Sequence, residues 1–321
     1  MTQDRLIVRR RIGDVETPVG AALKLGPDEP GAFIFESIAG GERLGRYSFI
    51  GLNPDVWLRV QHGVAETASR ADFSDAERFD GDPVAAIRFF AGAARATCDE
   101  DLPPMASGAF GYVGYDMIRH IEPVTITSPD DLGVPEALLA RPREVIIFDH
   151  LYQQILLVAR TPFGEEGAAA ARLDAIERRL DQPTPMVPVG RPPEPLDFTS
   201  NTTKARYFEM VERARRYTIA GDIFQVVPSQ RFSTPFSPRS LSLYRSLRRL
   251  NPSAFMFHMS FGDLRLVGSS PEIMVRVRDG RVAIRPIAGT RPRSGDPAED
   301  ARRAQSLLDD EKEMAEHLML L

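Results

Sequence analysis

Cysteine is almost absent from this sequence, because Cys98 is the only one in 321 residues. One cysteine excludes an internal disulfide framework and a zinc site built from thiolates. The sequence also lacks an apolar run of about 18 residues, so we expect no transmembrane helix. Its amino terminus lacks the apolar core of a signal peptide. By elimination, these absences predict a cytoplasmic protein.

A surplus of positive charge is missing as well. The net charge is −5, whereas a nucleic-acid-binding protein usually has a basic surface, so we expect no nucleic acid as a partner. The missing apolar run likewise predicts no membrane partner. The five histidines are scattered and give no Ser-His-Asp assignment, and no spacing matches a phosphate loop or a dinucleotide fingerprint. The composition, with 43% apolar residues, is that of a globular protein, and the length predicts about two domains.

The first half of the sequence is rich in β patterns. Apolar runs typical of strands occupy residues 33–35, 47–52, 56–60, 145–148 and 154–159, the last two as a hairpin. The tripeptide Asn53-Pro54-Asp55 predicts a turn within this series. Helical spacing predicts helices over 83–97 and 164–180.

Six prolines between 183 and 195 interrupt these patterns. Proline stiffens the chain and removes backbone donors, so we place a linker at 183–201. The linker separates an amino-terminal domain, 1–182, from a second domain, 202–321.

In the second domain, the sequence predicts a helix that Thr202 or Thr203 caps and Gly221 ends. Phe208 and Ile219 should face the core. Further elements are a buried strand at 222–227, a hairpin around Asp279-Gly280 and one long amphipathic helix over 297–321. Because the last helix has no terminating signal at Leu321, we expect sequence beyond it.

The last helix carries Asp309, Glu313 and Glu316 on one face. A solvated acidic face is the plain interpretation. The alternative is a magnesium site, because crowded carboxylates repel one another unless a cation bridges them. The spacing alone favours the solvated face.

Three other positions are candidates for chemistry. Glu272 follows Gly268-Ser-Ser-Pro in a loop next to a strand, and the turn 287–291 has small residues whose amides suit an anion. Gln225 lies in the expected buried strand, where its amide needs a partner. Each also has a plain structural interpretation, and the residues alone do not decide between them.

Taken together, these stretches resemble the chorismate-utilising enzymes and, among them, the family of anthranilate synthase large subunits (component I). The resemblance is carried by GDIFQVVPSQRF at 221–232, NPSAFM at 251–256, GSSPE at 268–272, RPIAGTRPR at 285–293 and DEKEMAEH at 310–317. It implies an α/β (α+β) fold of two packed, mainly antiparallel sheets flanked by helices. It also implies further active-site residues beyond Leu321, without which we expect the chain as given to be inactive.

The resemblance implies roles for individual residues. Glu313 and Glu316 match the acidic helix that binds Mg²⁺, and Glu272 matches the carboxylate that protonates the departing hydroxyl of chorismate. Gly289 and Thr290, with Ala288 before them, match the turn that binds the substrate's carboxylate region. Glu313 is therefore both a catalytic and a metal-binding candidate.

Two positions separate the subfamilies. Relatives that add water carry a lysine base where this chain has Gln225, and aminodeoxychorismate synthases often carry a lysine where it has Ala288. Both replacements favour ammonia addition and pyruvate elimination, which gives anthranilate, with ammonia from a separate glutamine amidotransferase subunit. Aminodeoxychorismate synthase component I and a non-catalytic tryptophan-binding fragment remain the alternatives.

The resemblance also implies feedback inhibition by tryptophan in the first step of tryptophan biosynthesis. The residues that match the effector site are Glu36, Ser37, Ser48, Ala254, Phe255 and Met256. Ala254-Phe255 departs from the Pro-Tyr of many relatives.

Overall fold

The computed structural model describes residues 4–39, 43–187 and 196–321. The chain falls into two compact units, one formed by Met1–Pro185 with Ser240–Leu321 and the other by Met186–Arg239. This division differs from the expected domains, because strands within 255–270 belong to the same sheet as strands of the first half. Residues 188–195 of the expected linker lie outside the described residues.

A ten-stranded sheet forms the centre of the first unit. Along the sheet the strands are β1 (Arg5–Ile12), β10 (Gln154–Thr161), β9 (Ala137–Asp149), β5 (Tyr47–Gln61), β2 (Phe33–Glu36), β13 (Phe255–Phe261) and β14 (Leu264–Ser270). Off this path, β6 (Val64–Ala68) pairs with β5 and β7 (Glu77–Arg78), and β8 (Phe110–Val113) pairs with β9. All these pairs are antiparallel, which confirms the expected class.

The expected turn at Asn53-Pro54-Asp55 is a bulge inside one continuous strand, β5. The register between β5 and β9 shifts between Pro54 and Val56, and Asn53 has a φ of 48°. Proline cannot donate to the sheet ladder, and a bulge is one of the places where a strand accepts it. The turn prediction was therefore wrong, while both flanking strand predictions are confirmed.

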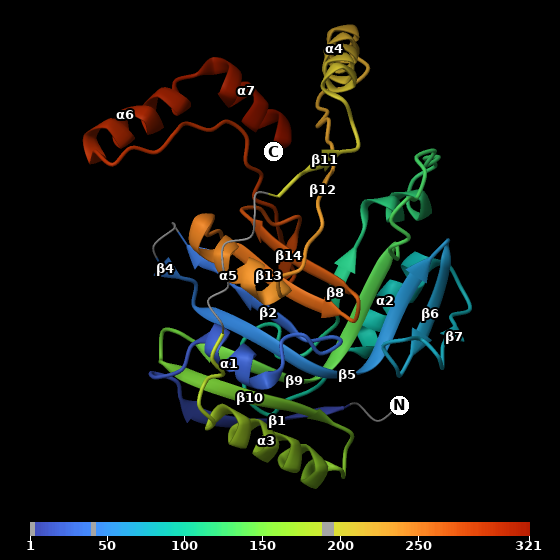
Figure 1. Ribbon diagram of the computed structural model, residues 1–321, viewed down its shortest axis with the longest axis vertical. Helices are drawn as coiled ribbons and strands as arrows, with labels where there is room; N and C mark the ends of the chain where they lie inside the picture. Colours follow the sequence, from blue (N-terminus) through green and yellow to red (C-terminus); the bar gives the residue numbers. More distant parts are fainter. Residues whose placement is uncertain (1–3, 40–42, 188–195) are drawn as a thin grey trace. The chain divides into compact units, whose positions relative to one another are not determined.

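Helices cover the sheet where its apolar side chains face them. Helices α1 (Pro18–Leu25), α3 (Glu166–Leu180) and α5 (Ser240–Leu250) lie along the sheet (Figure 1). Their side chains form a core with Ile34, Ile146 and Leu157 of the strands. Leu173 of α3 is fully buried, and burial of one such side chain stabilises the fold by about 1.5–3 kcal/mol. The predicted helices at 83–97 and 164–180 are confirmed, as α2 (Pro83–Ala93) and α3.

Gly268 on β14 lies opposite Phe257 on β13. A Cβ at Gly268 would lie 2.1 Å from the ring of Phe257, so this position accepts only glycine while the phenylalanine lies flat on it. The closely packed pair fixes the register of the strands that carry Met256 and the segment before Glu272.

The second unit contains α4 (Lys204–Ala220) with β11 (Thr199–Ser200) paired to β12 (Phe232–Ser233). The Oγ1 atom of Thr203 accepts from the Arg206 N–H at 3.2 Å, and Gly221 ends the helix at a φ of 80°, so both predicted ends are confirmed. The predicted inward side is wrong, because Phe208 and Ile219 are exposed.

The predicted strand at 222–227 is also wrong. These residues are irregular, and Phe224 and Val227 are exposed. An apolar run forms a strand only when a neighbouring strand pairs with its backbone, and no described strand pairs with this one.

The predicted helix over 297–321 is two helices, α6 (Pro297–Leu308) and α7 (Glu311–Leu320). Asp310 begins the second one, because its carboxylate accepts from the N–H groups of Lys312 at 3.1 Å and Glu313 at 3.2 Å. A side chain that caps a new helix ends the previous one, so the single-helix prediction was wrong.

The remaining short elements are β3 (Ile38–Ala39) paired with β4 (Arg43–Leu44), the 3₁₀ helix η1 (Tyr115–His120), and β15 (Arg276–Arg278) paired with β16 (Arg281–Ala283). The predicted hairpin is confirmed at its turn, where Asp279 and Gly280 have φ of 50° and 71°. Across the described residues, no helix combines the length and the apolar character needed to cross a membrane.

Candidate active site and effector site

Glu272 lies in the loop between β14 and β15. The N–H of Glu272 donates to the Ser270 hydroxyl at 3.4 Å, and that hydroxyl donates to the Glu272 carbonyl at 3.2 Å. The carboxylate is exposed and lines a hollow of about 500 Å³ together with Met274, Ile284 and Arg285. A carboxylate and a guanidinium therefore line one hollow, an arrangement suited to an anionic substrate that needs a proton donor.

The predicted substrate-binding turn lies against α7. A Cβ on Gly289 would lie 2.2 Å from the Oε2 atom of Glu313 and 3.0 Å from Leu307. Only glycine at position 289 leaves room for the Glu313 carboxylate. The structure therefore places Gly289 and Glu313 in contact. Thr290 is exposed and Ala288 is half-buried on either side of this contact.

Arg291 joins the same turn to the start of α7. Its Nη2 atom lies 2.8 Å from the carboxylate of Asp310, and its Nη1 atom lies 3.4 Å from that of Glu313. The N–H of Glu313, together with the Arg291 guanidinium, holds the pKa of the Asp310 carboxyl below its usual range. One cation thus holds the helix cap and the predicted metal ligand in place.

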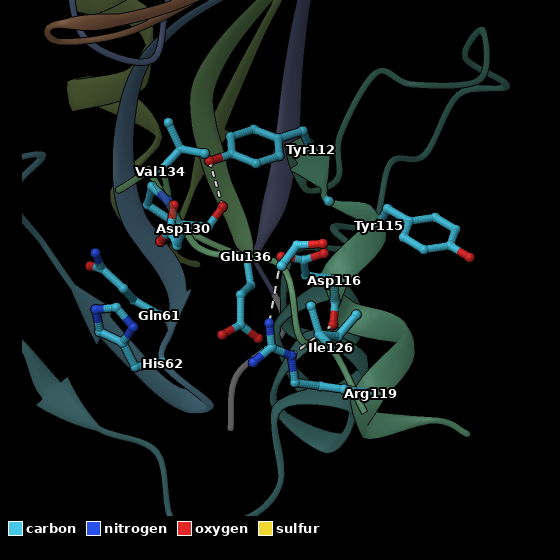
Figure 2. A pocket seen from close by; sticks show the side chains of 13 residues that line it. Gln61, His62, Tyr112, Tyr115, Asp116, Arg119, Ile126, Asp130, Val134 and Glu136 are labelled. Carbon is cyan, nitrogen blue, oxygen red and sulfur yellow. Dashed lines mark hydrogen bonds and ion pairs between the residues drawn. The ribbon is translucent and has the colours of Figure 1, made fainter. Parts of the chain in front are cut away.

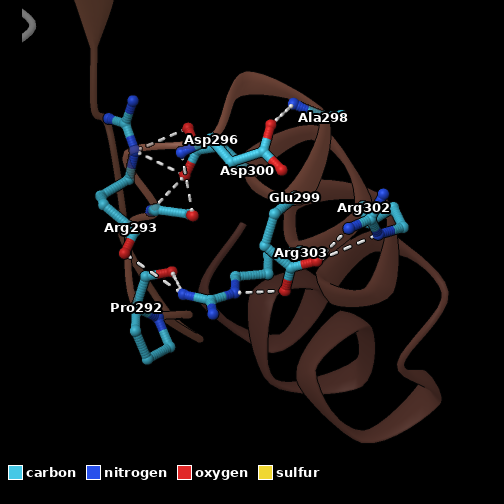
Figure 3. A network of polar contacts seen from close by, with 9 residues as sticks. Pro292, Arg293, Asp296, Ala298, Glu299, Asp300, Arg302 and Arg303 are labelled. Atoms are coloured by element: carbon cyan, nitrogen blue, oxygen red, sulfur yellow. Dashed lines mark hydrogen bonds and ion pairs between the residues drawn. The ribbon is translucent and has the colours of Figure 1, made fainter.

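A second set of contacts ties the following residues to α6 (Figure 3). Arg293 Nε donates to both carboxylate oxygens of Asp300 at 3.0 and 2.8 Å, and Arg303 donates to the Pro292 carbonyl at 2.9 Å. The Ser294 N–H and the Arg293 guanidinium lower the pKa of Asp300. The segment from Gly289 to Ser294 is therefore braced by both helices.

Glu313 and Glu316, the predicted metal ligands, lie three residues apart on α7 and are both half-buried. Within residues 4–39, 43–187 and 196–321, no group of three or more histidine, cysteine, aspartate or glutamate side chains is placed to hold a metal ion. Magnesium is usually bound by one or two carboxylates plus water and substrate oxygens, so two glutamates fit this ion.

Gln225 lies in the other compact unit, and its side chain is exposed. The expectation that it is buried in a strand is wrong. Its role in catalysis stays a prediction.

The predicted effector residues meet at one end of the sheet. Glu36 on β2 pairs directly with Met256 on β13, and the pairing of Phe35 with Phe49 places Ser48 next in line on β5. Residues directly opposite each other on paired strands share a face, so Glu36, Ser48 and Met256 lie on one face. All three are buried. Met256 belongs to the core cluster that contains Leu241 and Tyr244 of α5.

The buried carboxylate of Glu36 already has partners. The Tyr244 hydroxyl donates to it at 2.6 Å, and Arg248 Nε lies 2.8 Å from it. Burial beside this carboxylate raises the pKa of Tyr244 well above its ordinary value. Neither α5 residue was predicted from the sequence, although Tyr244 and Arg248 have the i, i+4 spacing of side chains that share one helical face.

Ser48 has a partner of its own. Its hydroxyl lies 2.7 Å from Nε2 of His150, a ring that stacks on Phe148, and burial lowers the pKa of His150. The Ser37 carbonyl accepts from the Gly45 N–H at 2.5 Å. Ala254 is half-buried, and Phe255 is 40% exposed, so these two lie at the rim of the cluster.

The fold combines a large antiparallel sheet with the acidic helix α7 and the turn at 289–293. Residues 43–321 match the family model of chorismate binding enzymes, and the chain belongs to that family.

Within the family, the chain is similar to proteins called anthranilate synthase component 1. It is 42% identical to the one from Cereibacter sphaeroides, over 99% of this chain and 66% of that protein. It is also 42% identical to the one from Thermus thermophilus, over 97% of this chain and 65% of that protein. The crystal structure of anthranilate synthase component I from Streptococcus pneumoniae superposes with a TM-score of 0.75 at 30% identity, covering 97% of this chain and 66% of that one. The chain therefore spans just under two thirds of the length of these relatives.

Proposed function

We propose that this chain is the chorismate-binding component of an anthranilate synthase, which converts chorismate and ammonia into anthranilate, pyruvate and water. The observation that carries the proposal is the 42% identity to a component 1 protein over 99% of the chain. The hollow that contains Glu272 and Arg285 supports it, because its charges suit a dicarboxylate that loses a hydroxyl group.

In the proposed reaction, ammonia forms a new carbon–nitrogen bond and the ring hydroxyl leaves as water with a proton from Glu272. The ring carbon that bears the new nitrogen then loses its proton. The enolpyruvyl group leaves and takes up a proton to become pyruvate, and the ring becomes aromatic. Gln225 and Ala288 support this course, because an amide does not deprotonate water and a methyl group does not attack the ring. Gly289 and Thr290 bind the carboxylate region of the substrate.

Magnesium belongs to the same proposal, with Glu313 and Glu316 as its ligands. The support is their i, i+3 spacing and the contact between Glu313 and the Gly289 turn. When bound, magnesium supplies positive charge that offsets a carboxylate of chorismate. Glu313 orients the turn that receives that carboxylate, and Arg291 holds Glu313 beside it.

Tryptophan is the proposed feedback inhibitor and a glutamine amidotransferase subunit the proposed source of ammonia. The effector proposal is supported by the buried cluster of Glu36, Ser48 and Met256, with Ser37, Ala254 and Phe255 beside it. The partner proposal is supported by the name component 1 of the relatives, which implies a second component.

The reaction is tested with the full-length gene product, chorismate, ammonium and magnesium. We expect anthranilate, identified by its fluorescence and by chromatography. Accumulation of isochorismate or aminodeoxychorismate would overturn the proposal.

The proposed metal ligand is tested in the same assay. Glu316→Gln keeps the shape of the side chain and removes its charge, so activity should fall about 100-fold or more while the circular dichroism spectrum is unchanged. The control is Glu311→Gln, an exposed carboxylate at the start of the same helix, which should leave activity intact. Equal activity of the two variants at limiting magnesium would mean that Glu316 lies on a solvated face and does not bind magnesium.

A further inference from the structure

The segment between β8 and β9 has a long stretch without regular structure. After η1, residues 121–136 contain neither helix nor strand. Irregular connections of more than about 12–15 residues are uncommon inside compact domains and are usually either functional or disordered, linker-like segments. Neither the reaction nor the effector site uses this one.

Specific contacts hold the last part of the segment, residues 130–136. Glu136 accepts from the Gly63 N–H at 3.0 Å and pairs with His120 at 2.8 Å. The Tyr112 hydroxyl donates to the Pro135 carbonyl at 2.9 Å, and Asp130 accepts from the Gly133 N–H at 2.9 Å. A fixed irregular surface is suited to recognition, because little order has to be gained on binding.

Large apolar side chains are exposed along this segment. Tyr115 is 85% exposed and Leu132 is 59% exposed. The others are Val113, Ile121, Val124 and Val134. Single exposed apolar residues are ordinary, but a group of them rimmed by polar side chains marks an interaction site.

Two of these residues, Tyr115 and Val134, line a hollow of about 300 Å³. Figure 2 shows Glu136 between the end of β5 with its following turn, where Gln61 and His62 lie, and η1, which carries Asp116 and Arg119. Three carboxylates, Asp116, Asp130 and Glu136, and one guanidinium, that of Arg119, line the hollow. Arg119 donates to the Asp116 carbonyl at 3.2 Å and lies 3.5 Å from the Asp116 carboxylate, and Glu136 pairs with His120. The hollow therefore has an excess of negative charge.

We propose that residues 113–136 are the docking surface for the amidotransferase partner, which inserts a lysine or arginine side chain into the hollow and packs apolar side chains on Tyr115 and Leu132. The proposal rests on the proposed function, which requires that partner. A basic side chain complements the carboxylates, and a buried cation ringed by apolar contacts is a common anchor of protein interfaces. A second copy of this chain fits less well, because a two-fold interface brings the same acidic surface against itself.

The test uses the full-length protein and the purified glutamine amidotransferase component encoded in the same genome. Asp116→Lys should raise the dissociation constant, measured by calorimetry, about tenfold or more and lower glutamine-dependent anthranilate formation. Leu132→Ser should do the same without a change of charge. Ammonia-dependent formation should stay at the wild-type rate in both variants, and added salt should weaken the wild-type complex.

Matched controls are Asp14→Lys and Ile12→Ser, which change an exposed acid and an exposed apolar residue outside the segment and should bind as the wild type does. Asp116→Asn, which only removes charge, should give an intermediate loss and serves if the lysine variant does not fold. Unchanged binding in Asp116→Asn and Leu132→Ser overturns the proposal. So does a homodimer of the chain alone that Leu132→Ser dissociates. A wild-type protein that makes no anthranilate from ammonia contradicts the proposed function instead, and the calorimetry still decides the docking surface.

Discussion

Gly289 and Glu313 illustrate how a single missing side chain shapes the candidate site. The Glu313 carboxylate occupies the space that any Cβ at position 289 would need, at 2.2 Å. The contact is between a turn and a helix that are 24 positions apart in the sequence. The sequence pattern marked both residues separately and gave no information about their contact.

We expect Gly289→Ala to push the Glu313 carboxylate away from the turn. The magnesium concentration that gives half-maximal activity should rise, and activity at saturating magnesium should fall about tenfold, equivalent to about 1.4 kcal/mol of transition-state stabilisation. The control is Gly295→Ala, where a new Cβ meets no atom within 4 Å. Wild-type magnesium dependence in Gly289→Ala would mean that Glu313 does not need its present position.

His258 is a second residue that its surroundings affect, because they change its pKa. The ring is fully buried on β13 and its Nε2 atom lies 2.8 Å from the Ser240 hydroxyl on α5. Burial lowers the pKa of His258, an effect that Asp28 opposes and Arg265 reinforces. The folded protein therefore keeps this ring neutral where an unfolded chain would bind a proton.

The free energy of unfolding should consequently depend on pH in a defined direction. The contribution of His258 is complete above the unfolded pKa of about 6.5 and is lost as the pH falls from there through the lower folded pKa, because only the unfolded state gains a proton in that range. One such group gives a slope of at most about 1.4 kcal/mol per pH unit. Urea denaturation between pH 7.5 and 5 measures it, and His258→Gln should give a shallower slope than the wild type. Equal slopes would contradict this account.

Among the elements, those with a strong local signal were predicted correctly. The β9–β10 hairpin follows from two apolar runs around a short polar turn, and α4 has Thr203 and Gly221 at its ends. The wrong predictions depend on a distant contact in one case and on local side-chain geometry in the other. Residues 222–227 are apolar but find no described strand to pair with, and the start of α7 is decided by the side-chain geometry of Asp310.

Two substitutions distinguish the helix cap that Asp310 gives α7 from the ion pair that Asp310 forms with Arg291. Asp310→Asn keeps an oxygen that accepts from the Lys312 and Glu313 N–H groups but loses its charge toward Arg291, whereas Asp310→Ala loses both. The alanine variant should destabilise the first turn of α7 by about 1 kcal/mol, which speeds amide hydrogen exchange at 312 and 313 about fivefold. The asparagine variant should keep most of the protection. If both variants exchange equally fast, the ion pair rather than the cap begins the helix.

At the scale of the whole molecule, the sheet connects segments that are far apart in the sequence. Glu36 contacts Tyr244 and Arg248 more than 200 residues later, and β2 pairs with β13. The family resemblance placed Glu36 and Met256 in one site. The α5 residues that hold Glu36 could not be predicted, because no local pattern encodes a contact over that separation.

This connection leads to a prediction about tryptophan. A ligand whose ammonium takes the place of Arg248 and Tyr244 on Glu36 of β2, and that also contacts Met256 of β13, binds both strands at once. It should therefore stabilise their pairing and raise the free energy of unfolding. At about 100 times the dissociation constant the gain is about 2.7 kcal/mol, measurable as a higher melting temperature.

Ser37→Phe tests the same idea from the neighbouring residue. A Cβ added at Gly45 would lie only 2.6 Å from that of Ser37, so a phenylalanine side chain has little room there and should distort the effector cluster. We expect the variant to need about tenfold more tryptophan for half-inhibition of anthranilate formation and to lose the tryptophan-dependent rise in melting temperature. Ser74→Phe, at an exposed position, is the control and should respond as the wild type does. If Ser37→Phe and the wild type are inhibited and stabilised by tryptophan at the same concentration, tryptophan does not bind on the paired strands β2 and β13. In that case the buried contacts of Glu36 with α5 serve the stability of the sheet alone.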